Sequence, residues 1–177
     1  MKILAGLSAT ALSAMLIAAS PGDDLFEQAA LALAKGVRAE VRGGRAALHQ
    51  AGAVLAATGA QPIDGQPDLA QRWQGRSAPP PMRNRTLGPA YRSISLAGGA
   101  SAQFDQVFYA GQHARAALVP TSGSGFTLTV RDDQQAAVCT ASPRNSRCDW
   151  VPTYTTRFRI EIRNAAKGLG EVFLIVR

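Results

Sequence analysis

The sequence has few of the side chains that most often bind metals or carry out nucleophilic catalysis. Its 177 residues include only two His and two Cys, too few for a closed zinc site built from those residue types. His49 lies in an Ala-rich stretch and His113 at the start of an expected strand, and neither lies near a nucleophile-elbow motif. We therefore predict a protein that is not an enzyme, with no catalytic residues, no metal ligands and no cofactor.

Aromatic residues are also scarce, at 6% of the chain, and few of them interleave with the arginines. That pattern argues against nucleic acid as a partner, because single-stranded nucleic acid is bound by stacking on aromatic side chains. The formal net charge is +7, which suits anionic polymers or acidic proteins as partners. Hydrophobic residues make up 46% of the chain, so the sequence is too apolar to be disordered throughout.

The first nineteen residues are typical of a secretory signal peptide. Lys2 supplies a positive charge, residues 3–19 carry none, and Ala19 is the small residue expected before a cleavage site. A retained membrane anchor is the alternative, although this apolar stretch is at the short limit of what spans a bilayer. The sequence thus predicts a signal peptide at 1–19 and a periplasmic or secreted protein.

The two cysteines agree with export. Cys139 and Cys148 are separated by a short stretch that contains Pro143 and Asn145 and should turn easily. In an oxidising compartment we expect them to form one local disulfide, with two free thiols as the alternative.

Residues 23–59 have a helical pattern. Phe26, Ala30, Leu33, Val37 and Val41 recur at steps of three and four, which indicates one apolar helix face. The glycines at 43 and 44 predict a break before a second, Ala-rich helix. This segment packs as a hairpin, docks on the rest of the chain or contacts a partner; the sequence leaves these options open.

Residues 60–90 lose all periodicity and predict a Pro-rich linker. Six prolines are mixed with Gln, Gly and Arg, and the run at 79–81 favours a stiff polyproline stretch. We expect Trp73 to fix this linker to a neighbouring surface.

In residues 91–177 the hydrophobic pattern changes to a period of two. Turn residues separate seven short expected strands, which favours an antiparallel β-sandwich. These strands are expected near residues 94–96, 104–109, 113–119, 126–130, 137–139, 157–163 and 172–176. The predicted fold class is therefore mainly β: a jelly-roll-like antiparallel sandwich preceded by a short α-helical segment and a Pro-rich linker.

Several short motifs in this half are similar to one known family. They are GFTLTVRD at 125–132, VC at 138–139, CDWVP at 148–152, FRIEIRN at 158–164 and FLI at 173–175. Together they resemble the bacterial pre-peptidase C-terminal (PPC) domain, in which a Trp-x-Pro element precedes an aromatic-x-Ile-x-Val-x-Asn strand. The resemblance covers residues 91–177. It implies a compact β-sandwich attached to exported proteins, with a binding or secretion-related role rather than an active site.

The chain differs from that family where some members bind a cation. The acidic residues expected at the start of the middle strand are replaced by Ser124 and Gly125, and Thr129 stands in place of an aromatic residue. Asp132 and Asp133 remain, but paired acids at a hairpin tip usually form the turn itself. We therefore predict no metal site.

Arginines alternate with apolar residues in the strand at 157–163. If Phe158, Ile160 and Ile162 point into the core, then Arg157, Arg159 and Arg163 point outward on one face. Such a face could bind phosphate, carboxylate or uronate groups. A solvated strand face, partly neutralised by Glu161, is the alternative.

These observations predict an exported, non-enzymatic accessory protein whose sandwich binds a protein or an anionic polysaccharide in the bacterial envelope. The alternative is a structural envelope protein that self-associates, or contacts the membrane, through its Ala-rich helices.

Overall fold

The computed structural model describes residues 21–75 and 88–177. The predicted signal peptide at 1–19 and the three prolines at 79–81 lie outside the described residues. No helix in the described part of the chain combines the length and the hydrophobicity that crossing a membrane requires.

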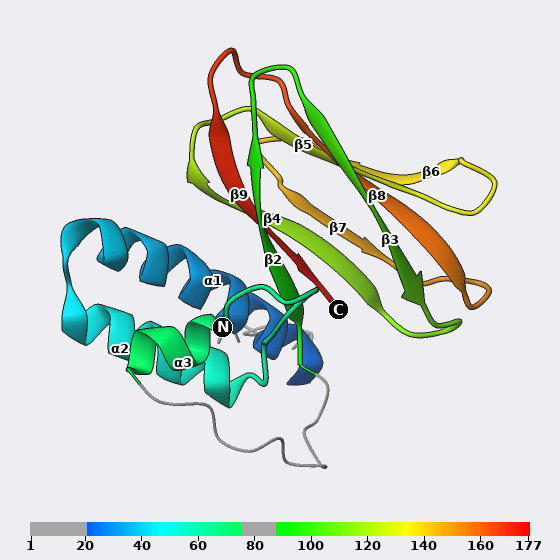
Figure 1. The fold of residues 1–177 in the computed structure, drawn as a ribbon. Helices are drawn as coiled ribbons and strands as arrows, with labels where there is room; N and C mark the ends of the chain where they lie inside the picture. Colours follow the sequence, from blue (N-terminus) through cyan, green and yellow to red (C-terminus); the bar gives the residue numbers. More distant parts are fainter. Residues whose placement is uncertain (1–20, 76–87) are drawn as a thin grey trace, which may run out of the picture.

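Two β-sheets face each other to form a sandwich (Figure 1). Sheet A contains, in spatial order, β1 (Gln61–Pro62), β2 (Ala90–Leu96), β9 (Gly170–Val176), β4 (Ala114–Ser122) and β7 (Arg147–Trp150). Sheet B contains β3 (Ser101–Phe108), β8 (Thr156–Asn164), β5 (Phe126–Arg131) and β6 (Ala137–Ala141). All paired strands are antiparallel except β1 and β2. The predicted fold class, a mainly β sandwich after a helical segment, is confirmed.

The period-two pattern of the sequence places the main core between the sheets. Side chains that alternate along each strand point inward, and their neighbours point to solvent. The inward residues of the two central strands of sheet B are fully or almost fully buried: Phe126, Leu128 and Val130 on β5, and Phe158, Ile160 and Ile162 on β8.

Asn164 ends β8 and is polar yet buried. Its side-chain amide donates to the carbonyl oxygens of Leu96 (3.0 Å) and Gly168 (2.9 Å), and its Oδ1 accepts from the backbone N–H of Ala166 (3.0 Å). This one side chain thus connects the end of β2 to the loop between β8 and β9.

The helices cover the outer face of sheet A (Figure 1). They are α1 (Pro21–Arg42), α2 (Arg45–Ala57) and α3 (Leu69–Gln74). A second hydrophobic core forms where Phe26, Leu33 and Leu55 of the helices meet the sheet. The strand residues in this core include Tyr91, Val119, Phe173 and Ile175. The helical segment is therefore packed on the sandwich, which answers a question that the sequence left open.

The two cores explain why β9 is a continuous apolar run. Val172, Leu174 and Val176 face the core between the sheets, whereas Phe173 and Ile175 face the helices. A strand that is buried on both sides cannot alternate apolar and polar residues.

The segment predicted as a linker is partly ordered. Gln61 and Pro62 pair in parallel with β2, and α3 follows, with Asp68 accepting a hydrogen bond from the backbone N–H of Gln71 (3.2 Å) at its start. Trp73 of α3 is buried against the helix hairpin, as expected of a residue that fixes this segment in place. A two-residue strand and a six-residue helix are too short to produce a periodic signal.

The strands of the sandwich differ from the expectation at two points. β7 is not among the strands expected from the sequence; it contains Cys148 and Trp150 and directly follows the stretch that was expected to turn. β4 also continues through Pro120, where a strand end was expected, and it pairs there with Val172. Pro120 is tolerated because β7 pairs only with residues 114–117, so β4 has a single neighbour at this point.

Candidate binding surface

The helices leave one broad face of the sandwich free. They occupy the outer face of sheet A, while no helix among the described residues covers the outer face of sheet B (Figure 1). A partner of the sandwich therefore has access to sheet B and to the loops at the two ends of the sheets.

The predicted arginine face lies on this free side. Arg157 and Arg163 are exposed and Arg159 is half-buried, while the residues that alternate with them are buried in the core. β8 runs between β3 and β5, so the three arginines form a row along the middle of the sheet. The predicted orientation of this strand is confirmed; anion binding by these residues remains a prediction.

Acidic side chains interrupt the arginine row. Arg159 forms an ion pair with Asp105 on β3 (3.3 Å), and its Nη1 donates to the side chain of Gln135 (3.3 Å). Glu161 lies on the same face, and Arg131 of β5 is the register partner of Arg159. The outer face of sheet B is therefore of mixed charge, and its cations are weaker sites for an anion than an uninterrupted row would be.

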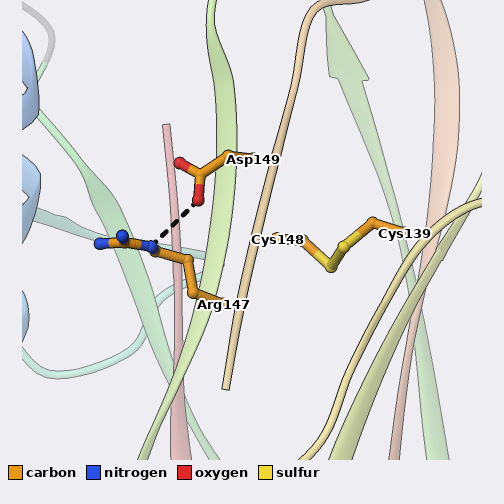
Figure 2. Close-up of a disulfide and its surroundings, with 4 residues drawn as sticks. All are labelled: Cys139, Arg147, Cys148 and Asp149. Atoms are coloured by element: carbon orange, nitrogen blue, oxygen red, sulfur yellow. Dashed lines mark ion pairs between the residues drawn. A yellow bond between two sulfur atoms is a disulfide. The ribbon is translucent and has the colours of Figure 1, made fainter. Parts of the chain in front are cut away.

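The predicted disulfide between Cys139 and Cys148 is present. It joins β6, the edge strand of sheet B, to β7, the edge strand of sheet A (Figure 2). The bond therefore links the two layers of the sandwich along one side, rather than closing a loop within one sheet. A disulfide of this kind fits a protein that matures outside the reducing cytoplasm.

The two residues that flank Cys148 point away from the disulfide, toward the helices (Figure 2). Arg147 forms ion pairs with Asp149 (3.0 Å) and with Glu27 of α1. Asp149 also pairs with Arg115 of β4 (2.8 Å), whose side chain is only 10% exposed. A small ionic network therefore connects α1 to the edge of sheet A and anchors the strand that carries the disulfide.

Exposed apolar side chains are found at the end of the sandwich that contains the β3–β4 loop, the β5–β6 turn and the β7–β8 loop. We call this group the distal rim; it consists of Val107, Tyr109, Val138, Val151 and Tyr154. Tyr154 is 76% exposed and Tyr109 is 60% exposed. The rim contains five of the eight large apolar residues that are exposed in the described chain, so it is the main exposed hydrophobic area of the sandwich.

Hydrogen bonds between loops hold the distal rim together. The backbone N–H of Ala110 donates to Thr155 Oγ1 (3.0 Å), and that of Gly111 donates to the carbonyl oxygen of Pro152 (2.9 Å). The hydroxyl of Thr156 donates to Asp133 Oδ2 (3.2 Å), which connects the β5–β6 turn to the same end. Three loops that are distant in the sequence thus form one surface.

Aromatic rings support the distal rim from inside. Trp150 stacks edge-on against Phe108 with ring centroids 4.8 Å apart, and its ring lies 5.6 Å from that of Phe158. Beside these rings lies a cavity of about 310 Å³, and Val138 and Tyr154 are among the residues that line it. Trp150 Nε1 is buried and has no hydrogen-bond partner among the described residues. Trp150 is therefore a structural support at the sandwich edge, and it also lines the cavity.

The structure also locates the acidic and histidine residues that the sequence analysis considered for chemistry. Asp132 Oδ1 accepts hydrogen bonds from the backbone N–H groups of Gln134 (3.0 Å) and Ala136 (2.8 Å), so Asp132 forms the turn. His49 and His113 are both exposed, on α2 and just before β4. Within residues 21–75 and 88–177 no group of three or more His, Cys, Asp or Glu gathers that could bind a metal ion.

The amino-acid sequence contains no pattern that predicts the distal rim. Its residues are spread over positions 107–154, and each apolar residue taken singly is unremarkable in a strand or loop.

No family model and no curated protein matches this chain. Among solved structures it is similar to PliG of Aeromonas hydrophila, a periplasmic inhibitor of g-type lysozyme, at 17% identity over 50% of this chain and 83% of that one (TM-score 0.43). It is also similar to the PPC domain of a collagenase from Bacillus anthracis, at 14% identity over 49% and 87% (TM-score 0.44). A third is the Yersinia pseudotuberculosis-derived mitogen, at 13% identity over 50% and 84% (TM-score 0.45). A PPC domain is thus among the structural neighbours of the half whose sequence resembles that family.

Proposed function

We propose that this chain is an exported, non-enzymatic binding module whose sandwich binds a protein partner of the bacterial envelope at the distal rim. The observation that carries the proposal is the grouping of exposed Tyr and Val side chains at the one end of the sandwich where three loops meet. Tyrosine is enriched at protein interfaces because its ring is apolar while its hydroxyl can still form hydrogen bonds.

The disulfide and the ionic network support a rigid surface at this end. Loops that are fixed by hydrogen bonds and rest on a stacked aromatic cluster lose little conformational entropy when a partner binds. β7, which carries Cys148, leads directly into the loop that bears Val151 and Tyr154. The cross-link therefore restrains the strand from which the rim projects.

An anionic polysaccharide bound to Arg157, Arg159 and Arg163 is the second candidate. The exposed arginines at both ends of β8 favour it, while the ion pair of Arg159 with Asp105 and the acidic Glu161 weigh against it. The alternative of self-association through the helices has less apolar surface to use, because Phe26 and Leu33 of α1 and Leu55 of α2 are buried in the second core.

The test is retention of envelope components on the immobilised protein. Val151→Ser with Tyr154→Ser should lower retention of a defined protein at least tenfold, since interface anchors contribute about 1–2 kcal/mol or more each. Leu169→Ser is the matched control, because Leu169 is 70% exposed but lies in the β8–β9 loop, outside the distal rim.

Three outcomes decide between the candidates. Unchanged retention in the rim variant contradicts binding at the rim. Retention that survives protease treatment of the extract, and that is lost at 0.5 M salt or in an Arg157→Ser, Arg159→Ser, Arg163→Ser variant, supports a polysaccharide instead. Concentration-dependent dimerisation without any retained component supports self-association.

A further inference from the structure

The α1–α2 hairpin has a groove that neither the sandwich nor α3 occupies. α1 presents Phe26 and Leu33 to the second core and Gly36 to Trp73 of α3. A third side of α1, which includes Leu31 and Arg38, lines the groove with α2. The groove has a volume of about 560 Å³ and is open to solvent.

The floor of this groove is apolar, and its sides are apolar in part. Ala32, Ala39 and Ala51 are almost fully buried and form the floor, and the second core lies behind them. Leu31, which is 57% exposed, and Val54 stand at the sides. A volume between about 300 and 1,000 Å³ with a mainly apolar lining and a few polar groups is typical of a small-molecule site.

The charges along the groove are all of one sign. Lys35, Arg38 and Arg42 recur along one side of α1, and none of the groove-lining residues is acidic. The two carboxylates of α1 whose side chains are described are engaged elsewhere: Glu27 pairs with Arg147 of β7 and Glu40 with Arg72 of α3. α2 contains no acidic residue at all. The groove therefore combines an apolar floor with a cationic edge.

We propose that this groove binds a single-chain anionic amphiphile, with its hydrocarbon chain on the alanine floor and its carboxylate at Arg38 and Arg42. The shape of the groove favours this ligand over a membrane surface. A helix that lies on a bilayer inserts bulky side chains such as Trp, Phe and Leu, which project from its surface. Here the apolar surface is concave and made of small side chains, so it can accept a narrow chain but has little to insert.

The test is binding of oleate to the purified protein, measured by isothermal titration calorimetry with oleate kept below its critical micelle concentration. Methyl oleate is the uncharged counterpart. We expect saturable binding of one oleate per chain, at least tenfold tighter than that of methyl oleate. An Arg38→Gln, Arg42→Gln double variant should remove this preference for the acid.

Two further variants test the apolar lining of the groove. Ala47 lines the groove but is itself exposed, so Ala47→Trp fills the space without adding volume to the core and should weaken binding at least tenfold. Leu31→Asn makes the same test at the side of the groove by removing an apolar contact. Val41→Ser is the matched control, because Val41 is 84% exposed on α1 but does not line the groove. Far-ultraviolet circular dichroism and Tm confirm that each variant is folded.

Several results would overturn the proposal: no saturable binding of oleate, equal affinity for oleate and methyl oleate, or unchanged affinity in both the Ala47→Trp and the Leu31→Asn variants. Binding to anionic vesicles without binding to monomeric oleate would assign the groove to a membrane surface. A dimer that Ala47→Trp abolishes would assign it to a second copy of this chain. None of these results bears on retention at the distal rim, so the two proposals succeed or fail separately.

Discussion

The contact between α1 and α3 provides the sharpest test of how the helices are packed. Gly36 lies in the middle of α1, directly under the indole ring of Trp73. A Cβ atom at position 36 would lie 2.2 Å from Trp73 Cζ3 and 2.3 Å from Trp73 Cη2. The substitution Gly36→Ala therefore cannot be accommodated unless the ring or the helix moves.

Two opposing effects decide the sign of this substitution. In an exposed helix interior Gly→Ala stabilises by about 1 kcal/mol, because glycine has more conformational freedom to lose. Overpacking a buried site costs about 1–3 kcal/mol. Since Trp73 is 6% exposed and the clash is with the rigid ring, we expect the steric cost to exceed the gain and Gly36→Ala to destabilise the protein by about 1–2 kcal/mol.

A double-mutant cycle with Trp73→Ala separates the two effects. Trp73→Ala alone should cost about 3–5 kcal/mol. In that background the clashing ring is absent, so Gly36→Ala should become neutral or stabilising by up to about 1 kcal/mol, which gives a coupling energy of about 1–3 kcal/mol. Guanidinium chloride unfolding of the four proteins measures the free energies of unfolding. If Gly36→Ala stabilises the wild-type protein, or has the same effect in both backgrounds, the packing of α3 on α1 described here is incorrect.

Three further predictions concern other parts of the fold. Replacing Cys139 and Cys148 by Ser should lower the free energy of unfolding by about 2–3 kcal/mol, from the entropy of a short closed loop, and an unchanged denaturation midpoint would contradict this. Asn164→Ala should cost about 2–4 kcal/mol in urea unfolding, because it leaves the buried carbonyl oxygen of Leu96 without its donor; a loss below 0.5 kcal/mol would refute the role of this side chain. Burial raises the pKa of Tyr91 to about 12, although the hydrogen bond from the Leu69 N–H to its hydroxyl oxygen acts in the opposite direction. Since the folded pKa lies above the ordinary value of 10, the contribution of Tyr91 to the free energy of unfolding is fully present below pH 10 and is lost as the pH rises through about 12. The decline in Tm between pH 9 and 11.5 should therefore be smaller in Tyr91→Phe than in the wild type. Equal declines in the two proteins would contradict this effect of Tyr91.

The sequence predicted the sandwich well because its strands carry strong alternating patterns. Phe126, Leu128 and Val130 are each followed by a polar residue, so both the strand and its buried face could be read directly. The pairing of Cys139 with Cys148 followed from there being only two cysteines, separated by a flexible turn. Strands and short-range disulfides of this kind depend on residues that are close in the sequence, so they can be predicted without knowing how the rest of the chain folds.

The parts that escaped prediction depend on contacts between distant segments. α3 is six residues long and is held by Trp73 against Gly36, which lies 37 positions earlier in the chain. The distal rim and the groove exist only once loops or helices are placed side by side. A single sequence contains no periodic signal for such surfaces, so the candidate binding sites had to come from the structure.

The bridge between β6 and β7 also determines how the sandwich can come apart. Both strands lie at the margin of their sheets, where each has only one hydrogen-bonded neighbour and would ordinarily fray on its own. Because the disulfide joins them, neither strand can separate from its sheet without displacing the other. β7 is also connected to α1 by the ion pair between Arg147 and Glu27. We therefore expect the edge formed by β6 and β7 to unfold under force or during proteolysis only together with both sheets and α1, as one cooperative unit.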